Sequence, residues 1–125
     1  MIKDVTEGIF NDLLKRSEKV LVVEWWSPGC SVCRDVAPVY EHVAEEMKDE
    51  AVFLRINTDA FGQMAARNGI SGTPTFTIFC RDGKKAEIVG MTSSTLLRNT
   101  IRDTIKYKVG CPVKKRISYE MDGYG

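Results

Sequence analysis

Four apolar stretches along the chain predict β-strands. Residues 20–23 form a nearly uninterrupted β-branched run, which is typical of a strand that is buried on both faces. Residues 51–56 are apolar except for one arginine, and residues 75–79 are rich in β-branched and aromatic side chains. The polar residues 81–84 predict a hairpin turn that leads into a fourth strand at residues 86–89.

Four other segments carry apolar residues at helical spacing and predict α-helices. The first covers residues 6–17 with Thr6 as its N-cap, and the last begins after an N-cap at Ser93. A short helix is predicted between an N-cap at Asp59 and a C′ residue at Gly69. In chain order, the apolar residues at helical spacing are Ile9, Phe10, Leu13 and Leu14, then Val36, Tyr40, Val43 and Met47, then Phe61, Met64 and Ala65, which are expected to face inward, and finally Leu97, Ile101 and Ile105.

The order of these elements, α-β-α-β-α-β-β-α, predicts an α/β fold. Crossover helices join parallel strands, and the last two strands form an antiparallel hairpin at one edge. We therefore expect a central mixed sheet with helices on both faces. The pattern covers one domain at residues 1–108, and we expect residues 109–125 to form a mobile tail.

Composition and charge narrow the classes of function. The chain has 125 residues, 43% of them hydrophobic and 28% charged, and a net charge of +1. Such a balance is typical of a soluble domain and predicts neither nucleic acid nor a membrane as a partner. Because the first residues lack an apolar signal-peptide core, we expect the protein to be cytoplasmic.

Two cysteines, Cys30 and Cys33, stand three apart where the strand pattern stops and the helical pattern begins. Cys30 is therefore expected at a helix N-terminus, where unpaired N–H groups stabilise a thiolate. Activating such a thiol at neutral pH requires about 2 kcal/mol, whereas the helix dipole supplies about 0.3–1 kcal/mol. Hydrogen bonds to the sulfur must supply the remainder. We predict that Cys30 is the nucleophile and Cys33 the resolving thiol.

Alternatives exist for this pair of cysteines. They could be half of a zinc site or two inert thiols, but zinc requires four ligands, and His42, Cys80 and Cys111 form no second pair at matching spacing. Redox chemistry is therefore favoured, without a metal. Cys80 and Cys111 are predicted to be inert thiols or, alternatively, a second disulfide.

Several short motifs occur together in an order that characterises one family. The segments are Trp26-Ser27-Pro28-Gly29-Cys30-Ser31-Val32-Cys33-Arg34 with Ala37-Pro38, which correspond to W-x-x-W-C-G-P-C-K with A-P; residues 55–59, which correspond to K-x-N-x-D; residues 72–75, which correspond to G-x-P-T; and the turn and bulge glycines Gly83 and Gly90. On these segments the chain resembles a thioredoxin over about residues 5–107.

The resemblance implies a thiol–disulfide oxidoreductase that reduces disulfides in other proteins, accepts electrons from a thioredoxin reductase-like donor and needs no cofactor. Its oxidised form would carry a Cys30–Cys33 disulfide. Glu24 takes the place of the buried proton acceptor, and Arg55 that of a nearby lysine. The residues that the resemblance assigns to substrate binding or to support of the site are Trp26, Gly29, Ser31, Val32, Pro38, Thr73, Pro74 and Gly90, with Pro74 in the cis form.

Some departures from the family pattern favour a second hypothesis. Gly29 replaces an exposed tryptophan, Ser31-Val32 replaces Gly-Pro, and Glu24 replaces an aspartate. The alternatives are a redox-slow thioredoxin-like protein-binding module, or a variant of the oxidase or isomerase type. Glu24 could also form only a structural ion pair with Arg55, because a buried carboxylate needs a partner.

Overall fold

A computed structural model of the chain describes residues 2–107, and the predicted tail at 109–125 lies outside them. Within these residues the strands form one sheet in the order β1-β3-β2-β4-β5. Strands β1 and β2 are both parallel to β3, whereas β4 is antiparallel to β2 and to β5. The strands are β1 (Ile2–Asp4), β2 (Val20–Trp26), β3 (Ala51–Asn57), β4 (Thr75–Cys80) and β5 (Gly83–Val89).

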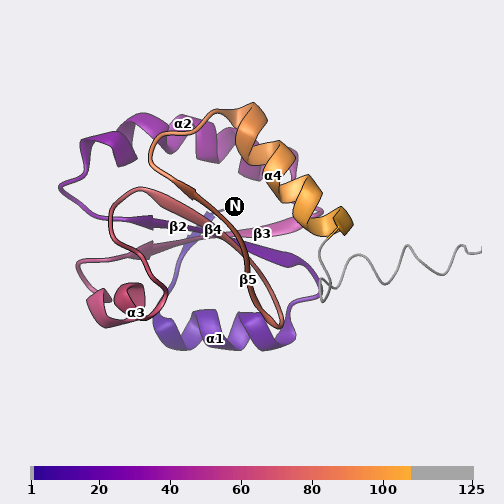
Figure 1. Ribbon diagram of the computed structural model, residues 1–125, viewed down its shortest axis with the longest axis horizontal. Helices are drawn as coiled ribbons and strands as arrows, with labels where there is room; N and C mark the ends of the chain where they lie inside the picture. The colour runs from indigo at the N-terminus through magenta and orange to yellow at the C-terminus, as the bar shows by residue number, and fades with distance from the viewer. Residues whose placement is uncertain (1, 108–125) are drawn as a thin grey trace, which may run out of the picture.

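Helices cover both faces of the sheet, as Figure 1 shows. Helices α2 and α4 lie on one face, and α1 and α3 lie on the other. Each face has its own core of buried side chains, because successive residues of a strand point to opposite faces. No helix of residues 2–107 has the length and hydropathy that a membrane span requires. The helices are α1 (Glu7–Arg16), α2 (Ser31–Glu46), α3 (Gly62–Arg67) and α4 (Ser94–Tyr107).

The predicted fold class is confirmed: the molecule is α/β, with a mixed sheet between two helical layers. Thr6 caps α1 by accepting a hydrogen bond from the N–H of Ile9 at 3.2 Å, and Ser93 accepts one from the N–H of Leu96 at 3.1 Å. Gly69 has a φ of 74°, as a C′ glycine requires. Strand β1 was not predicted, because three residues are too few to show a period of two.

The predicted N-cap at Asp59 is wrong. Helix α3 begins at Gly62, and the residue before it, Phe61, makes no side-chain capping bond. The side chain of Asn57 instead accepts a hydrogen bond from the N–H of Asp59 at 2.9 Å and a longer one from the N–H of Ala60 at 3.4 Å. This Asx-type turn keeps residues 59 and 60 out of the helix, since it gives their N–H groups a competing partner.

The register of the sheet brings distant segments to one edge. Strand β2 ends at Trp26, opposite Asn57 at the end of β3. Strand β4 runs the other way and begins at Thr75, which pairs with Trp25. The loops that follow β2 and β3 therefore meet the loop that precedes β4. We look for the functional site at this edge.

Tyr40 attaches α2 to the centre of the sheet. Its side chain is buried, and its hydroxyl lies 3.0 Å from the carbonyl oxygen of Val22 on β2 and 2.7 Å from that of Leu54 on β3. A hydroxyl has one proton, so it can donate to only one of the two carbonyls at a time. The bond links the helix that carries both cysteines to the two central strands.

Tyr40→Phe is therefore expected to lower the free energy of unfolding by about 1–2 kcal/mol, because a buried carbonyl loses its donor. Urea unfolding followed by circular dichroism measures the change. The matched control is Tyr107→Phe on α4, where the ring is 66% exposed and the loss should be close to zero. Equal effects of the two substitutions would contradict the anchoring role of Tyr40.

Candidate active site

Cys30 is the N-cap residue of α2, where the chain leaves β2. Its backbone is extended, with φ −89° and ψ 108°, and its Sγ accepts a hydrogen bond from the backbone N–H of Cys33 at 3.0 Å. The sulfur thus takes the place that a serine or aspartate oxygen has at an ordinary N-cap. An amide donor and the helix N-terminus both stabilise negative charge at this atom.

Cys30 and Cys33 form a disulfide, the pairing that the family resemblance implies. Their Cα atoms are 5.2 Å apart, within the range of ordinary disulfides. The two sulfurs differ in access: Cys30 is half-buried, whereas Cys33 is only 4% exposed. A sulfur atom of another molecule therefore meets Cys30 first. Pro38 lies inside the same helix on its exposed side, so the carbonyl of Arg34 receives no bond from residue 38.

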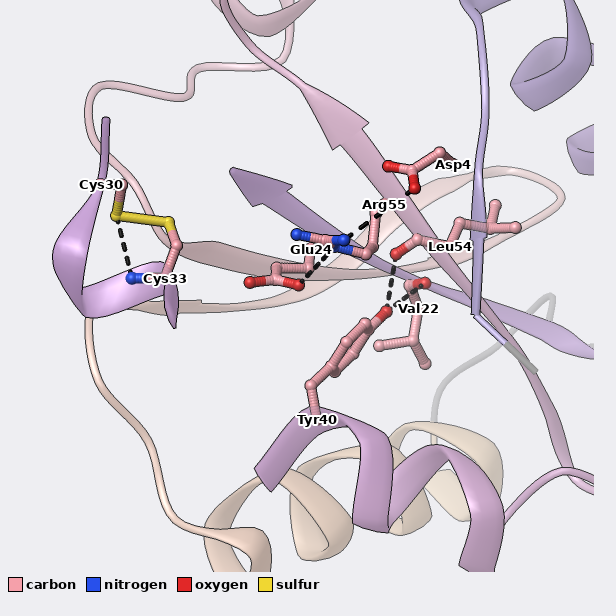
Figure 2. A network of polar contacts seen from close by, with 8 residues as sticks. All are labelled: Asp4, Val22, Glu24, Cys30, Cys33, Tyr40, Leu54 and Arg55. Carbon is pink, nitrogen blue, oxygen red and sulfur yellow. Dashed lines mark hydrogen bonds and ion pairs between the residues drawn. A yellow bond between two sulfur atoms is a disulfide. The ribbon is translucent and has the colours of Figure 1, made fainter. Parts of the chain in front are cut away.

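Glu24 lies in the middle of β2 and is 1% exposed. One carboxylate oxygen accepts a hydrogen bond from Nε of Arg55 at 3.2 Å, and the other has no partner within the described residues. Burial raises the pKa of Glu24, and the neighbouring Arg55 only partly offsets this effect. Figure 2 shows the carboxylate directed toward the side of the sheet where the disulfide lies.

Arg55 also contacts the start of the active-site loop. Its guanidinium carbon lies 4.3 Å from the ring centroid of Trp26, which is the geometry of a cation–π contact. The indole N–H of Trp26 is buried and has no acceptor among residues 2–107. One side chain of β3 thus contacts both the buried acid and the aromatic residue that ends β2.

The loop before β4 faces this junction. The Thr73–Pro74 peptide bond is cis, as the family resemblance implies. The carbonyl of Pro74 accepts a hydrogen bond from the N–H of Gly90 at 2.8 Å, and Gly90 has a φ of 88°, which favours glycine. Ser27 and Thr73 approach each other through their hydroxyls at 3.4 Å. The loop is therefore held both by the end of β5 and by the loop that carries Cys30.

The surface around the sulfurs is open and partly apolar. A Cβ atom at Gly29 would meet nothing within 4 Å, so the first carbon of a side chain at this position would not clash. Ser31 and Val32 are both exposed, Val32 at 37%. Met91, next to Gly90, is 56% exposed. These side chains form a surface that another polypeptide can contact.

Two residues of this region, Met91 and Asp4, were not predicted from the sequence. Asp4 lies 3.9 Å from Arg55 at the opposite side from Glu24. Its signal was hidden because β1 was not predicted. Among residues 2–107 no three His, Cys, Asp or Glu side chains gather in a group that could hold a metal ion. Cys80 is 2% exposed and is not a free thiol, whereas Cys111 lies outside the described residues. A Cys80–Cys111 disulfide therefore stays a prediction.

A protein that holds two electrons on a pair of sulfurs and exchanges them at its surface is a thiol–disulfide oxidoreductase. Comparison with known proteins agrees with this class. A family model described as thioredoxin matches residues 1–103. Thioredoxin 1 of Synechococcus elongatus is 35% identical over 98 residues, which are 78% of this chain and 91% of that protein. A chloroplastic M-type thioredoxin of Chlamydomonas reinhardtii is 33% identical over 98 residues, 78% of this chain and 69% of that protein.

Solved structures agree on the fold. The thioredoxin of Malassezia sympodialis superimposes with a TM-score of 0.74 at 25% identity, covering 82% of this chain and 90% of that one. Chloroplastic thioredoxin z has the same TM-score at 19% identity, covering 82% and 92% of the two chains. The chain belongs to the thioredoxin family. It is a thiol–disulfide oxidoreductase of the protein-disulfide reductase type.

The elevated pKa of Glu24 predicts how stability depends on pH. Since the folded protein binds this proton more tightly than the unfolded chain does, the associated stability is present at acid pH and is lost as pH rises through the folded-state pKa. Glu24→Gln removes the cost of ionisation. We expect its gain in unfolding free energy over wild type to grow from pH 4 to pH 8, by about 1.4 kcal/mol for each unit of pKa elevation.

Denaturant unfolding of the oxidised protein at several pH values measures this gain. The matched control is Glu45→Gln on α2, whose carboxylate is 62% exposed and bonds Lys48 at 3.0 Å. Its effect should stay below about 1 kcal/mol at every pH. A gain for Glu24→Gln that is constant or decreases with pH would contradict the elevated pKa.

Proposed function

We propose that Cys30 is the attacking thiolate and Cys33 the resolving thiol in the reduction of disulfides of other proteins. In the first step Cys30 Sγ bonds to one sulfur of the substrate disulfide, the S–S bond breaks, and the second substrate sulfur leaves as a thiolate. In the second step Cys33 Sγ attacks Cys30 Sγ and releases the other substrate thiolate. Two electrons pass to the substrate, and the Cys30–Cys33 disulfide remains.

The difference in exposure between the two sulfurs supports this order. Cys30 is half-buried at a helix N-terminus and accepts a hydrogen bond from a backbone N–H, so both its position and its bond favour the thiolate. Cys33 is 4% exposed and can meet only a sulfur that is already attached at Cys30. The proposal thus rests on one arrangement: the sulfur of Cys30 lies at the N-cap of α2, and the sulfur of Cys33 lies one turn further along the helix.

Glu24 is proposed to accept the proton of the Cys33 thiol in the second step. A carboxylate whose pKa is raised by burial is a stronger base at neutral pH than an exposed one. Its second oxygen has no hydrogen-bond partner within residues 2–107 and can take the proton. A cavity of about 160 Å³, lined in part by Asp4, Glu24 and Arg55, is large enough for water and gives the proton a way to the outside.

Substrate binding is assigned to the loop edge of the sheet. Trp26, Thr73 and Pro74 would support an extended segment of the substrate beside Cys30, and Gly90 keeps the Pro74 carbonyl in place. Gly29, Ser31 and Val32 would contact the substrate from the other side, with the exposed valine as an apolar contact. Because position 29 lacks a side chain, this chain is expected to select substrates differently from relatives with a tryptophan there.

The partners follow from the same chemistry. Thioredoxins act on disulfide-containing proteins and are re-reduced by a thioredoxin reductase, and we propose a reductase of that kind as the electron donor here. We propose the cytoplasm as the compartment, because a dithiol reductant requires reducing surroundings. Relatives with chloroplastic names make the chloroplast stroma the competing compartment.

Insulin reduction with dithiothreitol tests the assignment of the two cysteines. The wild type should precipitate the insulin chains faster than dithiothreitol alone, and Cys30→Ser should reduce the rate to that of dithiothreitol. Cys33→Ser should instead accumulate a covalent mixed disulfide with the substrate, because the first step proceeds and the second cannot. The double variant Cys30→Ser/Cys33→Ser is the control and should trap nothing.

A wild-type rate no greater than that of dithiothreitol would favour the redox-slow binding module. The reduction potential of the Cys30–Cys33 pair distinguishes a reductase from the remaining alternative, a variant of the oxidase or isomerase type. A potential of about −270 mV indicates a reductant, whereas a potential of about −120 mV indicates an oxidase-type protein. Trapping by Cys30→Ser in place of Cys33→Ser would reverse the proposed roles.

A further inference from the structure

Three charged side chains form one row across three neighbouring strands. Asp4 on β1 is the register partner of Arg55 on β3, and Arg55 is in turn the register partner of Glu24 on β2. In parallel strands register partners point to the same face of the sheet, which here is the face covered by α2. Figure 2 shows Arg55 between the two carboxylates.

One cation is therefore shared by two acids in different surroundings. Arg55 bonds Glu24 through Nε at 3.2 Å and approaches Asp4 through Nη1 at 3.9 Å. The Glu24 side chain is 2% exposed, whereas that of Asp4 is 63% exposed. The guanidinium group thus contacts both carboxylates, and its carbon also lies 4.3 Å from the ring centroid of Trp26.

The remaining groups around Glu24 add one more acid and no further cation among the described residues. Helix α2 contributes Glu41 and the hydroxyl of Tyr40, whose proton goes to one of two backbone carbonyls. On the other side β4 places the apolar Phe76 opposite Glu24. Asp4 and Glu41 both raise the pKa of Glu24, and Arg55 lowers it. The charge of Asp4 thus acts on Glu24 directly, and Asp4 also competes with Glu24 for the guanidinium of Arg55.

We propose that Asp4 is a positioning residue for the second step of the reaction: from the sheet edge it attracts Arg55 outward and so keeps Glu24 a sufficiently strong base to accept the Cys33 proton. This inference rests on the proposed function of Glu24. A carboxylate that is fully paired with a guanidinium is a poor proton acceptor. Asp4 prevents that full pairing without being buried itself, and its own position is outside the motifs that define the family.

Asp4→Asn separates this role from a structural one. The substitution removes a nearby negative charge and leaves Arg55 entirely to Glu24, and both changes lower the pKa of Glu24. The rate of the resolving step should therefore begin to rise at a lower pH than in wild type. Its rate on the high-pH plateau should be smaller, since a weaker base accepts the proton less readily.

Stopped-flow reaction of the reduced full chain with 5,5′-dithiobis(2-nitrobenzoate) measures the two steps apart. The first release of thionitrobenzoate reports attack by Cys30, and the second reports attack by Cys33. We expect Asp4→Asn to shift the pH midpoint of the second phase downward and to leave the first phase unchanged. Asp4→Glu, which restores the charge, should return the midpoint toward wild type.

The matched control is Asp12→Asn on α1, which removes an acid that is 57% exposed and 3.0 Å from Arg16. It should leave both phases unchanged. An unchanged midpoint in Asp4→Asn, or an equal shift in Asp12→Asn, would overturn the role of Asp4 while leaving Glu24 as the acceptor. Glu24→Gln tests whether Glu24 is the acceptor at all. If the rate of its second phase still rises with pH at the wild-type midpoint, Glu24 does not accept the proton, and the roles of both Glu24 and Asp4 are wrong.

Discussion

The site depends on where the central strand stops. Strand β2 is paired on both sides, and its residues up to Trp25 are buried, so neither its register nor its end can shift without breaking two ladders of hydrogen bonds. The loop after Trp26 is short, and Cys30 begins α2 directly beyond it. The sheet therefore determines the place of the reactive sulfur, and the helix determines its electrostatic surroundings.

Much of this arrangement could be predicted from local patterns. The buried run before the cysteines, the helical spacing after them and the caps Thr6 and Ser93 all depend on neighbours in the sequence, and each was found. The missing pieces depend on partners that are distant or ambiguous. Strand β1 has too few residues to show alternation, and its pairing with β3 spans some fifty residues of chain. At Asp59 the side chain of Asn57 forms a turn with the N–H groups of Asp59 and Ala60, and the helix begins later, at Gly62.

The candidate site divides in the same way. The two cysteines and the Thr73–Pro74 bond are visible in the sequence because motifs carry them. The contact of Arg55 with Trp26 and the bond from Gly90 to Pro74 are not, since they join segments from different strands. Resemblance to a family identifies residue types at matching positions. It does not describe which charged side chains of one particular chain contact each other. Here Asp4, at the edge of the sheet, shares Arg55 with Glu24.

The hydrogen bond between Gly90 and Pro74 links the loop before β4 to an outer strand. Strand β5 pairs with β4 along one side only, and its turn begins far from the sulfurs, at the opposite end of the hairpin. Because the N–H of Gly90 bonds the carbonyl of Pro74, the position of that carbonyl depends on where β5 ends as well as on where β4 begins. The cis Thr73–Pro74 peptide is therefore tied to a strand that lies two places away from β2 in the sheet.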